Sequence, residues 1–417
     1  MRLNYRTYKV TYVILMLFIL SCYLRDAVIV TEYFLVNRTF PYHVIKIISS
    51  SPLLYFRDVM MIVWNMYWIY RLKAKCRWVT ILLSCLIIYM IIGSITNLEL
   101  FSVFLVIFDI RVLLSILSFV GIYALLDMES NYDVDYYQHL TLKLIVFLSC
   151  ISAVVTIFQF YFLGFNMNVR LMGMFTNSQM NGYIMLASLV TLYTGWSVYS
   201  LFSRTQVVFL SSIIIIAIFL SGTRTALFGC ILFFVLIITI SLIKNIAREK
   251  RLAIYFCSLF FLALVVYISL NFVSDVSGRG DVLDQSHGGR ISVLIGLYNS
   301  LLNDGMIPLL FGKGLGYGSS PFISMYYESG MNPFYLWTDG TIQYFLLRQG
   351  LVGLVILFLL TTFFLFTCIK IGRLAVVIFL LVILTMLSTN VLEVYLFQVI
   401  LAFNLFCLKY SNSIKGC

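Results

Sequence analysis

The sequence predicts an all-α protein that crosses a membrane many times. Of the 417 residues, 62% are hydrophobic and 11% are charged, and a soluble domain of that composition would lack the polar side chains that cover its surface. The apolar residues also come in repeated stretches of roughly 17 to 25 residues, the length that an α-helix needs to cross the hydrocarbon core of a bilayer. We therefore expect a polytopic helical membrane protein in which residues 1–417 form a single transmembrane domain.

A hydropathy window finds about twelve candidate transmembrane helices along the chain. They cover approximately residues 8–24, 51–70, 78–95, 110–126, 141–163, 180–201, 206–220, 225–243, 252–273, 350–369, 374–390 and 392–408. Between the ninth and tenth helices, residues 271–350 form one long loop, and a loop of that length is usually functional.

Part of this loop is predicted to be helical. The stretch "RISVLIGLYNSLL" (290–302) repeats apolar side chains at every third or fourth position, which is typical of an amphipathic helix. The face that we expect to be buried carries Ile291, Leu294, Ile295, Tyr298 and Leu301 or Leu302. The glycine-rich stretch "GKGLGYG" (312–318) that follows lacks the spacing of a phosphate-binding P-loop.

The basic residues predict how the chain is oriented in the membrane. If the N-terminus is cytoplasmic, the basic clusters at residues 71–77 and 244–251 also face the cytoplasm, as do Lys370 and Arg373, in agreement with the positive-inside rule. Both termini are then cytoplasmic and the long loop is external. The same asymmetry accounts for the net charge of +11 without a nucleic-acid partner.

Arginine dominates the external side, because Lys46 and Lys313 are the only lysines that this topology places there. The positive-inside rule does not distinguish the two basic residues, so the excess of arginine indicates bidentate contacts with anions. Three of these arginines, Arg170, Arg224 and Arg290, stand at loop-to-helix junctions, where free N–H groups and the helix dipole also favour an anion. The alternative for Arg224, in the turn "SGTRT", is a side chain that reaches to lipid headgroups.

The long loop also carries candidates for acid-base chemistry. His287 and Asp339 could take the proton from a hydroxyl group that attacks a sugar carbon. The same chemistry is open to Asp281, Asp284, Asp304 and Glu328. The alternative for each of these residues is an ordinary solvated position in a loop.

Other external polar residues leave two interpretations open. Asn177, Gln179 and Asn181 either donate hydrogen bonds to a sugar or a phosphate, or cap the helix that follows them. Charged neighbours near the outer ends of two spans are expected to pair or to line a water-filled cavity. These neighbours are Arg57 with Asp58 and Asp109 with Arg111.

The cysteines and histidines indicate neither a disulfide framework nor a metal site. The nine cysteines include no C-x-x-C pair. The three histidines, His43, His139 and His287, are too far apart in the sequence to suggest a local metal cluster.

Five stretches, taken in order, carry a resemblance to a known superfamily. They are "RLMGMFTNSQMNG" (170–182), "SGTRTALFG" (221–229), "GRISVLIGLYNSLL" (289–302), "PLLFGKGLGYG" (308–318) and "TDGTIQYFLLRQGLVG" (338–353). In this order and topology the chain resembles the O-antigen polymerases (Wzy type) and the O-antigen ligases over roughly residues 140–370. The resemblance implies a GT-C-like architecture in the bacterial inner membrane.

The resemblance also implies an activity. A lipid-dependent glycosyltransferase of this kind acts at the outer face of the cytoplasmic membrane, with a glycan on undecaprenyl pyrophosphate as the donor and a sugar hydroxyl as the acceptor. It needs no nucleotide sugar, metal or other cofactor, and arginines stabilise the departing pyrophosphate. By this analogy Arg170, Arg224 and Arg290 contact the pyrophosphate, and Asp339 or His287 acts as the base. A chain-length regulator and a flippase of the same pathway are the possible protein partners.

Two departures from the superfamily pattern bear on the choice of activity. Where the ligases typically carry a histidine before the final loop helix, this chain has "WTDGT" with Asp339, which favours a repeat-unit polymerase. Where the family often has an Asn-Pro-Asn-like turn, this chain has "NSQMN" (177–181). The alternatives are a ligase that transfers glycan to lipid A core and, from a different class, a flippase of lipid-linked oligosaccharide.

Overall fold

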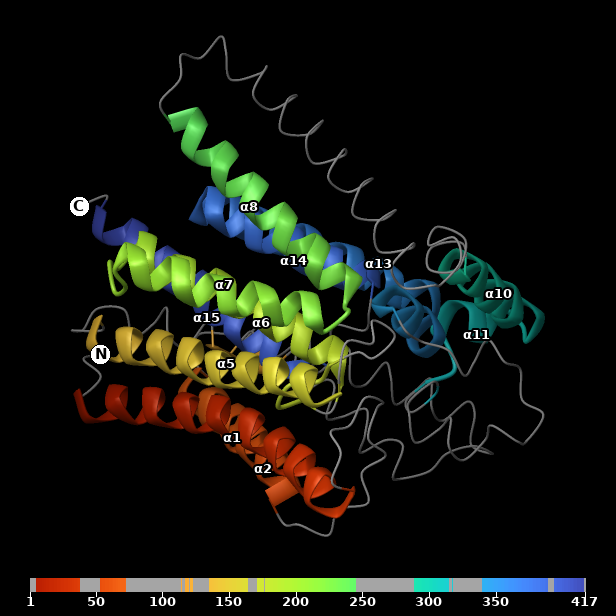
Figure 1. The fold of residues 1–417 in the computed structure, drawn as a ribbon. Coiled ribbons are helices and arrows are strands. Elements are labelled where there is room, and N and C mark those ends of the chain that lie inside the picture. The colour runs from red at the N-terminus through yellow and green to blue at the C-terminus, as the bar shows by residue number, and fades with distance from the viewer. Residues whose placement is uncertain are drawn as a thin grey trace.

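In the computed structural model, α-helices joined by short turns and irregular segments make up the parts of the chain that it describes. These parts are residues 5–37, 53–72, 114, 117–119, 121–122, 135–163, 171–175, 177–244, 289–314, 317, 340–388 and 394–415. The long helices form an elongated bundle, with two shorter helices beside one end (Figure 1). The helices are α1 (Tyr5–Asn37), α2 (Leu53–Leu72), α5 (Asp135–Leu163), α6 (Ser178–Ser197), α7 (Arg204–Leu220), α8 (Arg224–Lys244), α10 (Gly289–Asn303), α11 (Met306–Phe311), α13 (Thr341–Ile371), α14 (Arg373–Ser388) and α15 (Tyr395–Lys415).

Four helices of the described chain are long and apolar enough to cross a bilayer. They contain the segments Lys9–Leu35, Tyr136–Phe162, Arg224–Leu242 and Thr341–Ile371. Shorter apolar segments occur in α7, α14 and α15. These segments confirm the prediction of an all-helical chain with membrane-spanning character. The predicted spans at 78–95 and 252–273, and most of the span at 110–126, lie outside the described residues.

The predicted first span, residues 8–24, is too short. Helix α1 continues to Asn37 because the Arg25–Asp26 pair interrupts the hydropathy but not the helix. Arg25 Nη1 donates to Asp26 Oδ1 over 2.8 Å, and apolar residues resume directly after the pair. The hydropathy window therefore ended the predicted span at Arg25 and Asp26, although the helix continues past them.

One end of the bundle gathers the segments that the sequence singles out. Helix α7 ends and α8 begins there, and α5, α6 and α13 also have one terminus at this end, next to α10 and α11 (Figure 1, right). We call it the junction end. Helix α1 begins and α15 ends at the opposite end of the bundle (Figure 1).

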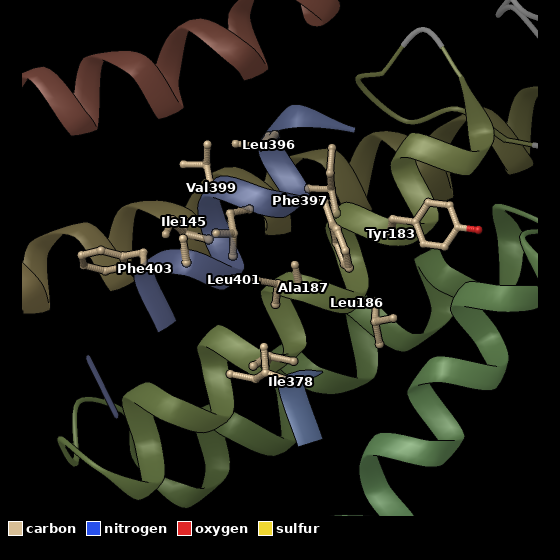
Figure 2. Packing of buried hydrophobic residues seen from close by; sticks show 14 of the residues in the cluster. Ile145, Tyr183, Leu186, Ala187, Ile378, Leu396, Phe397, Val399, Leu401 and Phe403 are labelled. Carbon is tan, nitrogen blue, oxygen red and sulfur yellow. The ribbon is translucent and has the colours of Figure 1, made fainter. Parts of the chain in front are cut away.

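Helix α6 is the centre of the bundle, and most of its residues are buried. It packs against α5, α7 and α15. Figure 2 shows Ala187 of α6 near Phe397 and Leu401 of α15. In hydrocarbon, close packing and polar contacts hold helices together. Such contacts occur here, because Asn404 of α15 donates to Thr191 of α6 over 2.8 Å, and Tyr23, Ser149 and Ser188 form a buried hydroxyl chain across α1, α5 and α6.

Helices α10 and α11 pack with the first part of α13 into a separate apolar cluster, made by Leu297, Leu301, Leu309, Tyr317, Leu346 and Leu347. The helix predicted at 290–302 is confirmed, but its predicted buried face is partly wrong. Leu297 and Leu301 are fully buried, whereas Ile295 is 55% exposed and Tyr298 is 39% exposed. The helix is turned so that Leu294, Leu297 and Leu301 face α11 and α13. The spacing of apolar residues was enough to predict the helix, but the packing against α13 determines which of its faces is buried.

The glycines of "FGKG" and the kink of α13 allow two backbones to cross at close range. The amides of Lys313 and Gly314 donate to the carbonyls of Leu347 and Arg348 over 2.7 and 3.1 Å. Gly350 has a φ of +62°, and a Cβ atom there would lie 2.5 Å from the Leu309 carbonyl oxygen. The two amides are thus occupied by protein carbonyls, in agreement with the prediction that this stretch is no P-loop.

Replacing Gly350 with alanine is expected to destabilise the cluster of α10, α11 and α13. The substitution adds a clash with the Leu309 carbonyl to the cost of a positive φ, which alone is about 1 to 2 kcal/mol. Gly305→Ala is the matched control, because Gly305 has a φ of +117° but a Cβ atom there would meet nothing within 4 Å. The melting temperature of the purified protein in detergent should fall further for Gly350→Ala. Equal losses would contradict the crossing described above.

Candidate functional site

The α7–α8 turn presents Arg224 as the first residue of α8, half-buried. Gly222 takes a φ of +62°, and Ser221 Oγ accepts from the amide of Thr223 over 3.3 Å. The first intrahelical bond runs from the Leu227 amide to the Thr223 carbonyl over 3.0 Å. The predicted helix start beside Arg224 is therefore confirmed. The N-terminal amides of a helix have no acceptor within the helix, and the positive end of the dipole lies beside the guanidinium.

The segment after Arg170 is held by one buried glutamine of α5. Gln159 Nε2 donates to the Gly173 carbonyl over 2.8 Å, and Gln159 Oε1 accepts from the amides of Met172 and Gly173 over 3.1 and 2.9 Å. The amide of Met174 donates to Ser152 Oγ over 3.2 Å. A Cβ atom on Gly173, which has a φ of +60°, would lie within 3 Å of Ser152 Oγ and two other side-chain oxygens. The loop can approach α5 this closely because the residue is glycine.

Two hydrogen bonds join this segment and the start of α6 to the α7–α8 turn. The Leu171 amide donates to the Leu220 carbonyl over 3.3 Å, and Thr223 Oγ1 donates to the Ser178 carbonyl over 3.1 Å. Gly182 lets the two elements meet, since a Cβ atom there would lie 2.8 Å from Ser221 Oγ. The residue that follows Arg170 thus lies against the helix end that precedes Arg224.

The remaining predicted site residues are described in part or not at all. Arg290 is the second residue of α10, at the junction end, and the structure describes its backbone but not its side chain. Arg170, His287 and Asp339 lie outside the described residues. Asp339 directly precedes Gly340, whose amide donates to Gln343 Oε1 over 3.1 Å at the start of α13.

Of the three amide residues predicted either to bind a ligand or to cap α6, two make hydrogen bonds within the protein. Asn177 is the N-cap of α6, with its Oδ1 accepting from the Gln179 amide over 2.8 Å. Asn181 is fully buried and donates to Thr156 Oγ1 over 3.1 Å. Both side chains therefore hold the protein itself together. Gln179 is half-buried and its role stays a prediction.

A buried group of charges lies beside the segment 171–175. Arg57 of α2 is 3% exposed, and its Nε and Nη2 donate to Asp58 Oδ1 over 3.2 and 3.1 Å. Its guanidinium carbon also lies 4.9 Å from the ring centroid of Tyr395. On α1, the Arg25–Asp26 pair is close enough to Arg57 for the charges to act on one another. Isolated charges at a membrane centre cost about 2.5 to 3.5 kcal/mol each, which explains why each has a partner.

These charges line a small, partly open cavity. Its walls are Cys22, Asp26, Arg57, Phe175, Met180, Tyr395 and Leu396. For Arg57 the structure confirms the predicted ion pair, and the same side chain also lines a cavity. Sequence reasoning missed Arg25 with Asp26 and also Gln159. The signal was present in each case, as two charges flanked by apolar residues in "YLRDAVIV" and one amide within an apolar span.

A second buried arginine stands at the base of the α10–α11–α13 cluster. Arg348 is 0% exposed, and its Nε donates to the Tyr317 carbonyl over 2.6 Å. Its guanidinium carbon lies 3.6 Å from the ring centroid of Tyr344, one turn earlier on α13. These contacts fix Tyr317 to α13, four residues after Lys313, where the crossing begins.

Replacing Gln159 with alanine is expected to release the segment 171–175. Each buried backbone group left without its partner costs about 1 to 3 kcal/mol. Hydrogen exchange of the Met172 and Gly173 amides should therefore accelerate on the order of tenfold or more. Gln206→Ala is the control, because it removes a capping contact with Ser203 at the opposite end of the bundle. Unchanged exchange in the Gln159 variant would show that the loop is held by other contacts.

Comparison with known proteins identifies no family for this chain. No family model, no curated protein and no solved structure matched it. The functional argument therefore rests on the residues and their geometry.

Proposed function

We propose that this chain is a polysaccharide repeat-unit polymerase at the outer face of the bacterial cytoplasmic membrane. The enzyme transfers a growing glycan from undecaprenyl pyrophosphate to the terminal sugar hydroxyl of an incoming lipid-linked repeat unit. The proposal includes the full set of about twelve spans, a GT-C-like architecture and cytoplasmic termini.

The observation that carries the proposal is the contact between the two arginine-bearing junctions. The hydrogen bond from the Leu171 amide to the Leu220 carbonyl brings the residue after Arg170 against the turn that leads to Arg224. Arg290 opens α10 at the same end of the bundle (Figure 1). A lipid pyrophosphate is a leaving group with several anionic oxygens, and arginines that approach it from separate elements match that charge.

The distribution of lysine among the described residues supports an external junction end. Helix α1 begins near Lys9, and α8 and α15 end at Lys244 and Lys415, all at the opposite end (Figure 1), whereas Lys313 follows α11 at the junction end. By the positive-inside rule the opposite end is cytoplasmic. Lipid-linked repeat units that have been flipped outward would then meet the arginine-bearing junctions.

The proposed reaction is a direct displacement at the anomeric carbon. Asp339 or His287 takes the proton of the acceptor hydroxyl, the oxygen attacks the anomeric carbon, and the bond from that carbon to the pyrophosphate oxygen breaks. The released pyrophosphate keeps the bonding electrons, and Arg170, Arg224 and Arg290 stabilise its charge. Such a displacement inverts the configuration at the anomeric carbon. The donor is already activated, so the reaction needs neither a nucleotide sugar nor a metal.

Replacing Arg224 with alanine is expected to stop chain growth while the protein remains in the membrane at its normal level. Loss of one charge-assisted contact to a leaving group costs on the order of 2 to 4 kcal/mol, or a rate loss of roughly thirtyfold to a thousandfold. The control is Arg204→Ala, because Arg204 also begins a helix but is exposed at the opposite end. The measurement is the length distribution of the surface glycan. Normal lengths with Arg224→Ala would remove this residue from the site.

Replacing Arg290 with alanine tests the loop helix in the same way and separates two related activities. A polymerase variant leaves acceptors that carry a single repeat, because the first unit is still transferred by another enzyme. A ligase variant leaves bare acceptors, with full-length polymer stranded on its lipid carrier. Normal-length polymer on its normal acceptor would contradict both activities.

A further inference from the structure

The cavity between α1, α2 and α15 is lined by two polar residues that use only part of their hydrogen-bonding capacity within the described chain. Asp26 is 1% exposed and Arg57 is 3% exposed, and both line the cavity. Asp26 accepts from Arg25 through Oδ1, and Arg57 donates to Asp58 through Nε and Nη2. Within the described part of the chain, Asp26 Oδ2 and Arg57 Nη1 make no hydrogen bond. Each residue therefore keeps one polar atom to which no other described residue is hydrogen-bonded.

The charges of Asp26 and Arg57 act on each other, but the two described side chains do not form an ion pair with each other. The space that separates them fits a single water-sized group. A group that fills it must accept a hydrogen bond from Arg57 and donate one to Asp26. A hydroxyl group does both.

The charges around the cavity select a neutral ligand group. Among the described residues, Arg25, Asp26, Arg57 and Asp58 sum to zero formal charge, so a phosphate would meet two carboxylates and an ammonium group would meet two guanidinium groups. This balance differs from that of the proposed pyrophosphate site, which has three arginines. The cavity therefore suits the hydroxyl of a sugar better than it suits the lipid pyrophosphate.

The walls of the cavity connect it to the loop that follows Arg170. Phe175 ends the segment clamped by Gln159, and Met180 lies in the first turn of α6. The aromatic rings of Phe175 and Tyr395 offer apolar surface next to the polar pair. A ring with one hydroxyl in the cavity would lie beside the segment that leads to Arg170.

We propose that Asp26 and Arg57 form a hydroxyl-binding subsite that holds the acceptor sugar of the incoming repeat unit. The inference rests on the proposed polymerase function and adds to it a recognition site on α1 and α2, outside the arginine-bearing junctions. Asp26 and Arg57 are binding residues in this scheme. The proton of the attacking hydroxyl is still taken elsewhere.

The test uses purified full-length protein in proteoliposomes and lipid-linked repeat units extracted from cells that lack this gene. Acceptor KM and kcat are measured for the natural unit and for synthetic units in which one hydroxyl of the acceptor sugar, other than the attacking hydroxyl, is replaced by hydrogen. With the wild-type protein, one of the deoxy units should lose roughly tenfold to a hundredfold in kcat/KM, the range expected for a hydrogen bond to a charged group. If the wild-type protein treats every deoxy unit as it treats the natural one, the subsite is disproved.

The variants link that loss to the cavity. Asp26→Asn and Arg57→Gln should each raise the acceptor KM by a similar factor and should no longer discriminate against the deoxy unit. Asn404→Ala is the control for general destabilisation, because it breaks a buried contact with Thr191 away from the cavity. It should lower the melting temperature and leave the discrimination intact.

Cys22→Leu decides the question if the charge variants fail to fold. Cys22 lines the cavity one turn before Asp26, and leucine fills the space while all four charges remain. The proposal expects a raised acceptor KM. If the cavity holds only a structural water, the variant changes the melting temperature and leaves KM as it was, which would overturn the subsite. Absence of any elongation by the wild-type protein would instead overturn the polymerase itself, so the two failures are distinguishable.

Discussion

The side chain of Gln159 is the contact on which the junction end depends. An irregular segment such as 171–175, set against membrane-spanning helices, must find partners for its amides and carbonyls within the protein. One amide side chain supplies a donor and an acceptor at once, and Gly173 brings the backbone close enough to use both. Because the segment is fixed, its neighbour Leu171 can meet the end of α7. The geometry around Arg224 follows from that chain of contacts.

The buried charges obey the same constraint in another form. Each is paired with its immediate neighbour in the sequence, Arg25 with Asp26 and Arg57 with Asp58. Each helix therefore carries its own counter-charge, and the cost of desolvating the charges is partly offset before the helices pack. Neighbouring pairing also leaves part of each group unused, because two adjacent side chains cannot enclose each other. Asp26 and Arg57 line the same cavity, and Asp26 Oδ2 and Arg57 Nη1 bond to no other described residue.

The sequence predicted the helices well and the contacts between them poorly. Composition and hydropathy were enough for α5, α7 and α8, whose ends agree with the predicted spans within several residues. The extent of α1 was missed because a hydropathy average cannot see that Arg25 and Asp26 neutralise each other. The exposed side of α10 was misjudged because Ile295 and Leu297 are equally apolar, and the position of α13 decides between them. Arg224 was placed correctly by turn chemistry. Gln159 stands out in the sequence as an amide within an apolar span, but its partners are backbone groups of the segment 171–175, and the sequence does not show which groups it binds.

The central position of α6 has a consequence for how the protein is made. Its buried face is completed by α15, and the contact from Asn404 to Thr191 spans 213 positions of the chain. Helix α6 leaves the ribosome long before α15. Until α15 is inserted, Thr191 and the apolar residues around it lack their partners, in the bilayer or beside the insertion machinery. The α10–α11 pair likewise waits for α13. Biogenesis of this protein is therefore a late assembly of helices that were inserted early, and substitutions in α15 would be felt first as a defect in maturation.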